Sequence, residues 1–256
     1  MVKLNFGEAN AKLRGLEKAI GGKIWTFSLL SGINCPYAKE CKSMAVMSVD
    51  GRLSIVDGPD TQWRCFSASQ EVLFPNVYQS RKHNADTILP IAANNPAAAA
   101  DLICANLPKK FAGIRIHVGG DFSTLNYFRA WIEVCKRNPS KIFYAYTKSL
   151  PFWIKELANI PSNFILTASY GGHKDDLIAK HNLRFAKVVF SVDEATSLGL
   201  EIDKNDFSAY NPLTKNNSFA LLIHGVQPKG SKASKAVRAL NGVGSYGRGD
   251  TLTIKV

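Results

Sequence analysis

The sequence predicts a single α/β domain, built either as a βα barrel or as a doubly wound parallel sheet. Short apolar, β-branched runs recur along the chain, and segments with helix start and stop signals separate them. The runs are almost continuously apolar, which is typical of parallel strands covered on both faces. The chain has 256 residues and is 46% hydrophobic, enough for one large buried core. We therefore expect one domain over residues 1–256.

Six runs are expected to form the sheet, and helices are expected between them. The expected strands are Ile24–Leu30, Gly113–Val118, Ile142–Thr147, Phe164–Ser169, Lys187–Val192 and Phe219–His224. The expected helices after the second strand are one capped by Ser123, one opened by Ser149 and Pro151, and shorter ones at Lys174–His181, Glu194–Leu198 and Ser231–Leu240.

The connection after the first strand is much longer than the others. It contains Cys35, Cys41 and Cys65, a β-hairpin that turns at Asp50-Gly51, and helices around Ala68–Ala93 and Ala97–Leu107. Asp-Gly between two β-prone runs predicts a type I′ turn.

Composition limits the location and partners of the protein. No apolar run approaches the roughly 20 residues that span a bilayer, and the first residues lack the apolar stretch of a signal peptide. We expect a cytoplasmic protein without a membrane segment, in which cysteines are metal ligands or free thiols rather than disulfides.

The formal net charge of +12 suggests an anionic partner such as nucleic acid, although it can also serve solubility alone. The stretch from Lys229 to Arg248 contains no acidic residue. Its cations either cradle phosphates or form a solvated helix face. They are Lys229, Lys232, Lys235, Arg238 and Arg248.

Cys35, Cys41 and Cys65 are the strongest candidates for function. They flank turn signals, and loops can aim thiolates at one point where a periodic helix or strand often cannot. Neighbouring cations, Lys39 and Arg64, are expected to lower the thiol pKa values. Cys104 and Cys135, in contrast, lie on apolar helix faces and are expected in the core.

The three cysteines are either unrelated free thiols or ligands of one metal centre. A zinc site would normally need a fourth protein ligand, and the chain has no C-x2-C pair. A [4Fe–4S] cluster fits three cysteines better, with one iron open or held by another ligand such as His117 or His224. We therefore expect a cluster at Cys35, Cys41 and Cys65.

The ends of the later strands are expected to surround the same site, because such folds place their chemistry at the carboxyl ends of the strands. Gly119 and Gly120 would let a ligand approach the backbone, and Asp121 could accept a hydrogen bond from an amine or hydroxyl. The other polar strand ends are Tyr146–Lys148, Ser169–His173, Ser191–Asp193 and His224–Gln227.

This layout resembles the radical S-adenosylmethionine enzymes, which are partial βα (TIM-like) barrels with a three-cysteine cluster loop and a Gly-Gly-acidic strand end. The resemblance implies a partial barrel, a cluster on the three cysteines, and a methionine pocket lined by Gly119, Gly120 and Asp121. The cysteine spacing here is C-x5-C-x23-C rather than the usual C-x3-C-x2-C, and Asp121 stands where glutamate is usual.

The whole chain also resembles a phage and bacterial family known as gene product eighty-eight. The resemblance implies a phage origin, and hence the host cytoplasm, but no particular activity. The segments that carry it are Cys35–Cys41, Arg64–Ser69, Arg115–Phe122, Tyr144–Pro151 and His224–Gln227.

The sequence thus predicts an iron–sulfur protein that acts as a redox or radical-type enzyme on an anionic substrate, with S-adenosylmethionine as a second cofactor. Two alternatives remain open: a nucleic-acid-binding phage protein with a structural iron–sulfur or zinc site, and an electron carrier. No catalytic residue is assigned.

Overall fold

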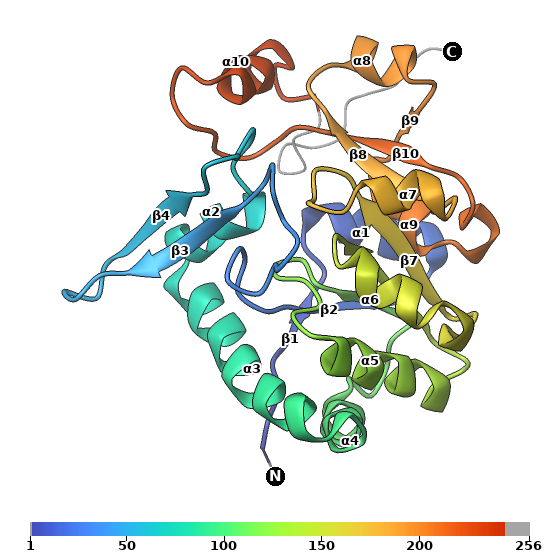
Figure 1. The fold of residues 1–256 in the computed structure, drawn as a ribbon. Coiled ribbons are helices and arrows are strands. Elements are labelled where there is room, and N and C mark those ends of the chain that lie inside the picture. Colours follow the sequence, from blue (N-terminus) through green and yellow to red (C-terminus); the bar gives the residue numbers. More distant parts are fainter. Residues whose placement is uncertain (1, 244–256) are drawn as a thin grey trace.

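An open sheet of eight strands forms the centre of the computed structural model, which describes residues 2–243 (Figure 1). In spatial order the strands are β1 (Phe6–Glu8), β2 (Ile24–Phe27), β5 (Gly113–Ile116), β6 (Ile142–Thr147), β7 (Phe164–Ser169), β8 (Phe185–Val189), β10 (Phe219–Leu222) and β9 (Glu201–Ile202). β1 runs antiparallel to β2, and every other neighbouring pair is parallel.

The strand order decides between the two expected architectures. From β2 to β10 each new strand joins the same side of the sheet, whereas a doubly wound sheet would reverse direction at a switch point. The sheet therefore winds in one direction, as in a barrel. A TIM-like barrel is not confirmed, because within residues 2–243 β1 and β9 remain edges and the sheet does not close. The α/β class and all six expected strands are confirmed.

Five helices cover one face of the sheet. Right-handed crossovers between successive parallel strands place their helices on the same side, which is what a singly wound sheet requires. Fully buried Phe27, Ile116 and Phe143 from the strands pack there with Ile88 and Trp131 from the helices. The helices are α3 (Pro75–Asn94), α4 (Pro96–Asn106), α5 (Leu125–Arg137), α6 (Leu150–Lys155) and α7 (Asp176–Lys180).

The opposite face of the sheet, which we call the inner face, is covered by two helices that the sequence-based prediction did not include. They are α1 (Ala11–Ile20) and α9 (Phe207–Tyr210). Leu13 and Leu16 of α1 pack on Tyr144 and Ile165 of the strands. The face also carries ionised side chains, described below.

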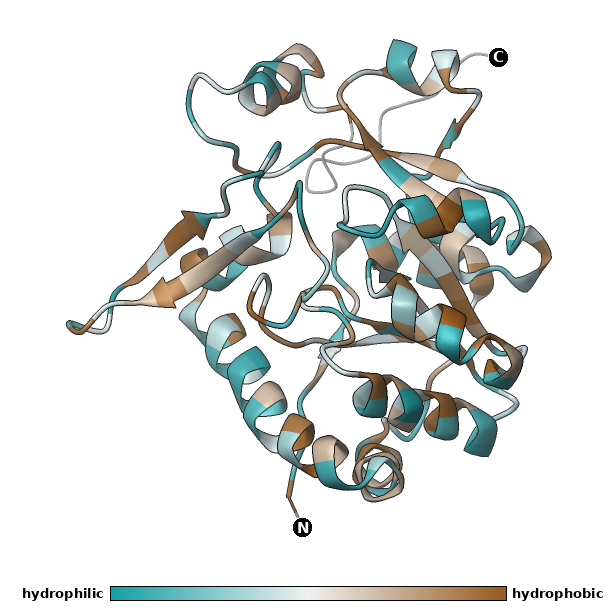
Figure 2. Ribbon diagram, in the orientation of Figure 1, coloured by the Kyte–Doolittle hydropathy of each residue, from teal (hydrophilic) through white to brown (hydrophobic). Residues whose placement is uncertain are grey.

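The cysteine-containing connection folds over the carboxyl ends of the strands. It contains the hairpin of β3 (Ser43–Met47) and β4 (Leu53–Asp57) and the helix α2 (Phe66–Leu73). The single helix expected over Ala68–Ala93 is wrong: it breaks at Phe74, because the next residue is Pro75. In Figure 2 apolar residues gather in the central strands and the hairpin.

The expected type I′ turn of the hairpin is also wrong. Ser48 N–H donates to the carbonyl of Arg52 at 2.9 Å, so three residues form the loop. Of these three, Gly51 alone has a left-handed φ, of 79°. This is the three-residue loop with a left-handed glycine, in which the first two positions keep negative φ.

The remaining elements complete the C-terminal part, with α8 (Val192–Ser197), α10 (Lys232–Ala239) and short 3-10 helices at Leu157–Asn159 and Pro212–Thr214. Thr124, one residue later than the expected Ser123, caps α5 by accepting from Tyr127 N–H at 3.2 Å. No helix within residues 2–243 has the length and apolar character needed to cross a membrane.

Candidate functional site

The segment from residue 30 to residue 43 carries Cys35 and Cys41 and is attached to the strand ends. Asn34 lies in this segment directly before Cys35, and Asp121 lies just beyond β5. The carbonyl of Asn34 accepts a hydrogen bond from the N–H of Asp121 at 3.0 Å. This bond joins the cysteine segment to the Gly-Gly-Asp turn, as the sequence predicts. The two motifs therefore meet at the carboxyl edge of the sheet.

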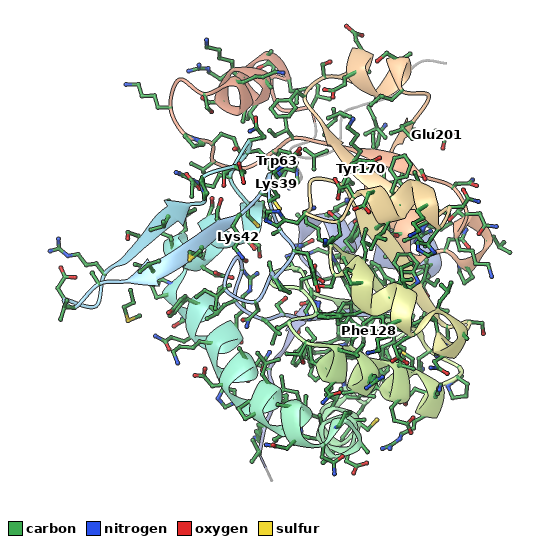
Figure 3. All side chains as sticks on the ribbon, in the orientation of Figure 1. Lys39, Lys42, Trp63, Phe128, Tyr170 and Glu201 are labelled. Atoms are coloured by element: carbon green, nitrogen blue, oxygen red, sulfur yellow. The ribbon has the colours of Figure 1, made fainter. Side chains whose placement is uncertain are left out.

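A second attachment joins the same segment to the end of β7. The carbonyl of Gly171 accepts from the N–H groups of Lys39 and Glu40, at 3.2 and 2.9 Å. A Cβ atom at Gly171 would lie 2.9 Å from the Trp63 ring, so only glycine permits this approach. Figure 3 shows Lys39, Trp63 and Tyr170 close together beside the strand ends.

Cys65 reaches the same region from a distant part of the chain, at the start of α2. Its N–H donates to Ser43 Oγ at 3.3 Å, two residues beyond Cys41. The Gln227 side chain fixes the preceding residue: its Oε1 accepts from Arg64 N–H at 2.8 Å, and its Nε2 donates to the Arg64 carbonyl at 3.2 Å. The loop after β10 therefore positions Cys65.

The thiols of Cys35, Cys41 and Cys65 lie within electrostatic range of one another. Burial raises the pKa of the Cys35 thiol well above its usual value, and the charges of Asp121, Cys65 and Cys41 add to this effect. Burial also raises the pKa of the Cys65 thiol, and the charge of Cys41 raises it further. Hydrogen bonds from backbone amides in the first turn of α2 act in the opposite direction and lower this pKa. All three thiols are partly buried.

For Cys35 and Cys65, the predicted lowering of the thiol pKa by neighbouring cations is wrong. Arg64 forms an ion pair with Asp57, in which Arg64 Nη2 lies 2.6 Å from Asp57 Oδ2. Lys39 is exposed, and Lys42 donates to the carbonyl of Cys35 at 2.8 Å rather than to a sulfur. Of these cations, Lys42 fixes the backbone around Cys35.

The expected metal site receives no direct support from the geometry. Within residues 2–243, no group of three or more histidine, cysteine, aspartate or glutamate side chains is arranged to hold a metal ion. Four thiolates around one zinc ion would lie about 3.8 Å apart, given Zn–S bonds of about 2.3 Å. In a [4Fe–4S] cluster each cysteine binds a different iron, so the thiolates stand farther apart than those around a single ion.

His117, one expected fourth ligand, lies in the aromatic layer under α5. Its φ of 69° is left-handed, and its Nε2 lies 3.0 Å from Tyr127 Oη. The ring packs against Phe122 with centroids 4.8 Å apart. Burial lowers its pKa to about 3, so it is a neutral core side chain.

His224, the other expected ligand, lies beside the cysteine region. Its ring is 5.0 Å from the ring of Phe66, the residue after Cys65. Its Nδ1 lies 3.0 Å from the Leu222 carbonyl. Burial lowers the His224 pKa, which favours a neutral imidazole able to act as a metal ligand.

Gly119 and Gly120 have a packing role in the structure. A Cβ at Gly119 would lie 2.5 Å from Ser67 Oγ, and one at Gly120 would lie 2.8 Å from Leu29 Cβ. Gly120 also has a φ of 82°. The space beside the Cα atoms of Gly119 and Gly120, where the sequence led us to expect a ligand, is therefore occupied by side chains of the protein. Their part in cofactor binding stays a prediction.

Asp121 connects two strand ends. Its Oδ1 accepts from Thr147 Oγ1 at 2.6 Å and from Phe122 N–H at 2.7 Å, and its Oδ2 accepts from Lys148 N–H at 2.8 Å. Lys148 Nζ in turn donates to Ser169 Oγ at 2.6 Å. The polar strand ends of β5, β6 and β7 thus form one network. Ser191, by contrast, caps α8 through Glu194 N–H.

Behind the cysteine segment lies a buried ion pair that the sequence did not reveal. Glu71 Oε1 accepts from Arg81 Nη1 at 2.7 Å and from Ser31 Oγ at 2.8 Å. Glu71 follows two serines and a glutamine in α2, so its local sequence is that of an exposed helix position.

A cleft of about 300 Å³ opens between the β1–β2 edge and the start of α3. Arg81 lines it, but its guanidinium is held by Glu71. The other lining side chains are mainly amides and hydroxyls, a set suited to a small polar molecule. They include Asn10, Thr26, Ser28, Gln70, Ser80 and Asn84.

Ionised side chains on the inner face form a second network that the sequence did not reveal. The fully buried Asp206 carboxylate lies 2.7 Å from Lys12 Nζ and 2.6 Å from Arg115 Nη1. Tyr146 Oη donates to the same carboxylate at 3.0 Å. Burial acts to raise the Asp206 pKa, but the two cations outweigh it and lower the pKa to about 2.

The expected basic surface lies on and beside α10. Lys229, Lys235 and Arg238 are exposed, and Lys232 Nζ lies 5.4 Å from the centroid of the Phe190 ring. Arg248 lies outside the described residues.

Fold and site together define an α/β protein with an open, singly wound sheet and three cysteines gathered at its carboxyl edge. Residues 3–241 match the family described as Gene product 88, and the chain belongs to that family. The family prediction is confirmed, whereas the layout of the radical S-adenosylmethionine enzymes stays a prediction. No curated protein and no solved structure matches the chain.

Proposed function

We propose that Cys35, Cys41 and Cys65 hold a [4Fe–4S] cluster, used in redox or radical-type chemistry on a small molecule. One observation carries the proposal: partly buried thiols from two separate segments come within electrostatic range of one another at the carboxyl ends of parallel strands. Ligand and catalytic sites of α/β sheets concentrate at that edge.

The electrostatics favour a positively charged occupant. Three adjacent thiolates repel one another, and burial adds to the cost of ionising them. Iron in a cluster supplies the positive charge that offsets this cost, because the bound ligands are thiolates. With three cysteines, one iron takes another ligand. We propose His224 for a closed site, because it lies beside Phe66. S-adenosylmethionine is the proposed ligand for an open one.

The chain's own residues would hold this site in shape. Gln227 fixes the backbone before Cys65, Lys42 fixes the carbonyl of Cys35, and Asp121 joins the neighbouring strand ends. A bound cluster would supply one-electron transfer. The cleft beside α3 would take a small polar substrate. Its side chains do not favour the anionic substrate that the net charge suggests, because Arg81 is paired with Glu71.

The test is the metal content of protein purified without oxygen. We expect about four irons and four sulfides per chain. Replacing Cys35, Cys41 or Cys65 singly with serine should remove most of the iron. Cys104→Ser is the matched control, because Cys104 lies on α4 and accepts a hydrogen bond from Asn138. Full iron in the Cys65→Ser protein, or stoichiometric zinc in place of iron, would overturn the assignment.

A second measurement separates the open from the closed site. S-adenosylmethionine added to reduced protein should change the electron paramagnetic resonance spectrum if it binds the open iron. An unchanged spectrum at millimolar cofactor excludes the radical-type reaction. A histidine nitrogen coupling that disappears in His224→Ala would instead establish the closed site, and with it electron transfer or a structural cluster.

Nucleic-acid binding is a second candidate, favoured by the acid-free basic surface of α10. Lys235 and Arg238 are exposed three residues apart on this helix, a spacing that places both on one face. Lys235→Ala with Arg238→Ala should weaken binding of DNA or RNA and reduce the slope of log affinity against log salt by about 1 to 2. An unchanged slope would remove α10 from the interface.

A further inference from the structure

A second cleft lies at the opposite edge of the sheet, where β7 and β8 begin. It has a volume of about 260 Å³. Trp153, Ile160 and Phe164 contribute apolar wall, and Arg184 and Lys215 contribute positive charge. The remaining polar lining consists of Ser162, Asn182 and Asn216. Among the residues that the structure describes, no acidic side chain lines this cleft.

Arg184 is unusual because it is buried and no carboxylate of the described part of the chain forms an ion pair with it. Only 5% of the residue's surface is exposed to solvent. Its Nη1 donates to the carbonyls of Ser208 and Thr214, at 2.9 and 3.3 Å. Its Nη2 donates to the carbonyl of Ala209 at 3.2 Å and to Thr167 Oγ1. Every one of these acceptors is neutral. Its buried Nε has no hydrogen-bond partner within residues 2–243.

The other arginines that reach the interior are treated differently. Arg81 pairs with Glu71 at 2.7 Å, and Arg115 pairs with Asp206 at 2.6 Å. Burying a guanidinium without an anion is costly, since neutral carbonyls replace only part of its hydration. Consistent with that cost, burial lowers the Arg184 pKa to about 10, and the opposing charges of Tyr146 and Asp203 offset this effect only in part. An anion in the cleft would restore the missing partner.

We propose that this cleft binds a small organic anion, with its oxyanion group at Arg184 and Lys215 and its apolar body against Trp153 and Ile160. The volume limits the ligand to a small molecule, because typical ligand pockets start at about 300 Å³. Carboxylate and phosphate groups share the chemistry that two cations and amide donors recognise. The site is separate from the cysteines, which lie at the other end of the strands.

Phenyl phosphate and benzoate are the probes, because they place each oxyanion on the same apolar ring, and benzyl alcohol is the neutral control. Trp153 lines the cleft and reports binding by its fluorescence. We expect saturable binding of at least one anion, with a Kd on the order of 0.1–1 mM, and no saturation with benzyl alcohol. The tighter probe identifies the head group.

Variants locate the site. Lys215→Ala should weaken binding about tenfold, whereas Lys110→Ala, at another exposed lysine, should leave it unchanged. Trp153→Phe should remove the fluorescence change. Arg184→Gln should abolish binding, and circular dichroism checks that it is folded. The proposal fails if neither anion saturates, if benzyl alcohol binds as well, or if Lys215→Ala and folded Arg184→Gln bind like the unmodified protein.

Discussion

Replacing Gln227 with methionine tests how the cysteine site is assembled. The Gln227 side chain makes three hydrogen bonds: one from Arg64 N–H, one to the Arg64 carbonyl and one to the His224 carbonyl, at 2.8, 3.2 and 3.0 Å. Gln227 and Arg64 are 163 positions apart. Methionine keeps the length and approximate volume of the side chain but removes every one of these bonds. Cys65, the next residue along from Arg64, then loses its attachment to the loop after β10.

The expected size of the effect follows from the number of bonds. A hydrogen bond contributes about 1 kcal/mol net, and its loss leaves partly buried backbone groups unpaired. The free energy of opening the segment around Cys65 should therefore fall by about 2–3 kcal/mol. Since about 1.4 kcal/mol is tenfold in an equilibrium constant, Cys65 should open roughly 30- to 150-fold more often.

Alkylation of each cysteine, followed by mass spectrometry on reduced, metal-free protein, measures this opening. Cys65 should react faster in Gln227→Met by the same factor, while Cys104 on α4 keeps its rate and reports on global stability. Gln62→Met is the matched control, because Gln62 is exposed and, within residues 2–243, its side chain donates only to the Asp60 carbonyl, at 3.4 Å. An unchanged Cys65 rate, or an equal rise at Cys104, would refute the local mechanism.

Three further predictions concern stability and are measured by urea denaturation. Asp206→Asn should destabilise the protein by about 3–5 kcal/mol, because it removes the buried carboxylate that pairs with Arg115 and leaves Lys12 paired with Asp203; a loss below 1 kcal/mol would contradict the network. The Asp206 pKa is lowered from 3.8 to about 2, so its stabilisation is complete above pH 4 and disappears as the pH falls through 2. Between pH 4 and pH 2 the free energy of unfolding should therefore change less with pH in Asp206→Asn than in the unmodified protein. Parallel curves for the two proteins would contradict this role of Asp206. Gly120→Ala should cost about 1–3 kcal/mol more than Gly51→Ala, because both glycines have left-handed φ but only Gly120 would place a Cβ against Leu29; equal costs would show that packing is unimportant there.

The strands were predictable because their signal is local. Buried parallel strands are nearly continuous apolar runs, and Ile142–Thr147 and Phe164–Ser169 form strands with the expected bounds. Closure of the sheet is not a local property. It depends on strand tilt and stagger, which residue periodicity does not specify, so the sequence could not distinguish an open sheet from a barrel.

The site was predictable to the extent that its residues mark turns. Cys35 and Cys41 flank turn residues, and Gly120 has the positive φ for which glycine is suited. The partners that fix them were hidden, since Glu71 contacts Ser31 across 40 positions. Local charge also misled: Arg64 adjoins Cys65 in sequence, yet its guanidinium reaches Asp57.

The two proposed ligand sites follow from one physical argument applied with opposite sign. Around Cys35 the charges that raise the thiol pKa, those of Asp121 and the other thiols, are negative, and the nearby Lys42 ammonium is bound by backbone carbonyls, so the site calls for a cation. Around Arg184 the direct acceptors are neutral and the second lining charge, Lys215, is positive, so that cleft calls for an anion. Asp206 shows the contrasting case. It is as deeply buried as Arg184, but two cations of the same chain compensate its charge and hold its pKa low. We therefore expect a structural role for Asp206 and no ligand. Burial of charge alone therefore does not identify a binding site in this protein; burial of charge without compensation from the chain does.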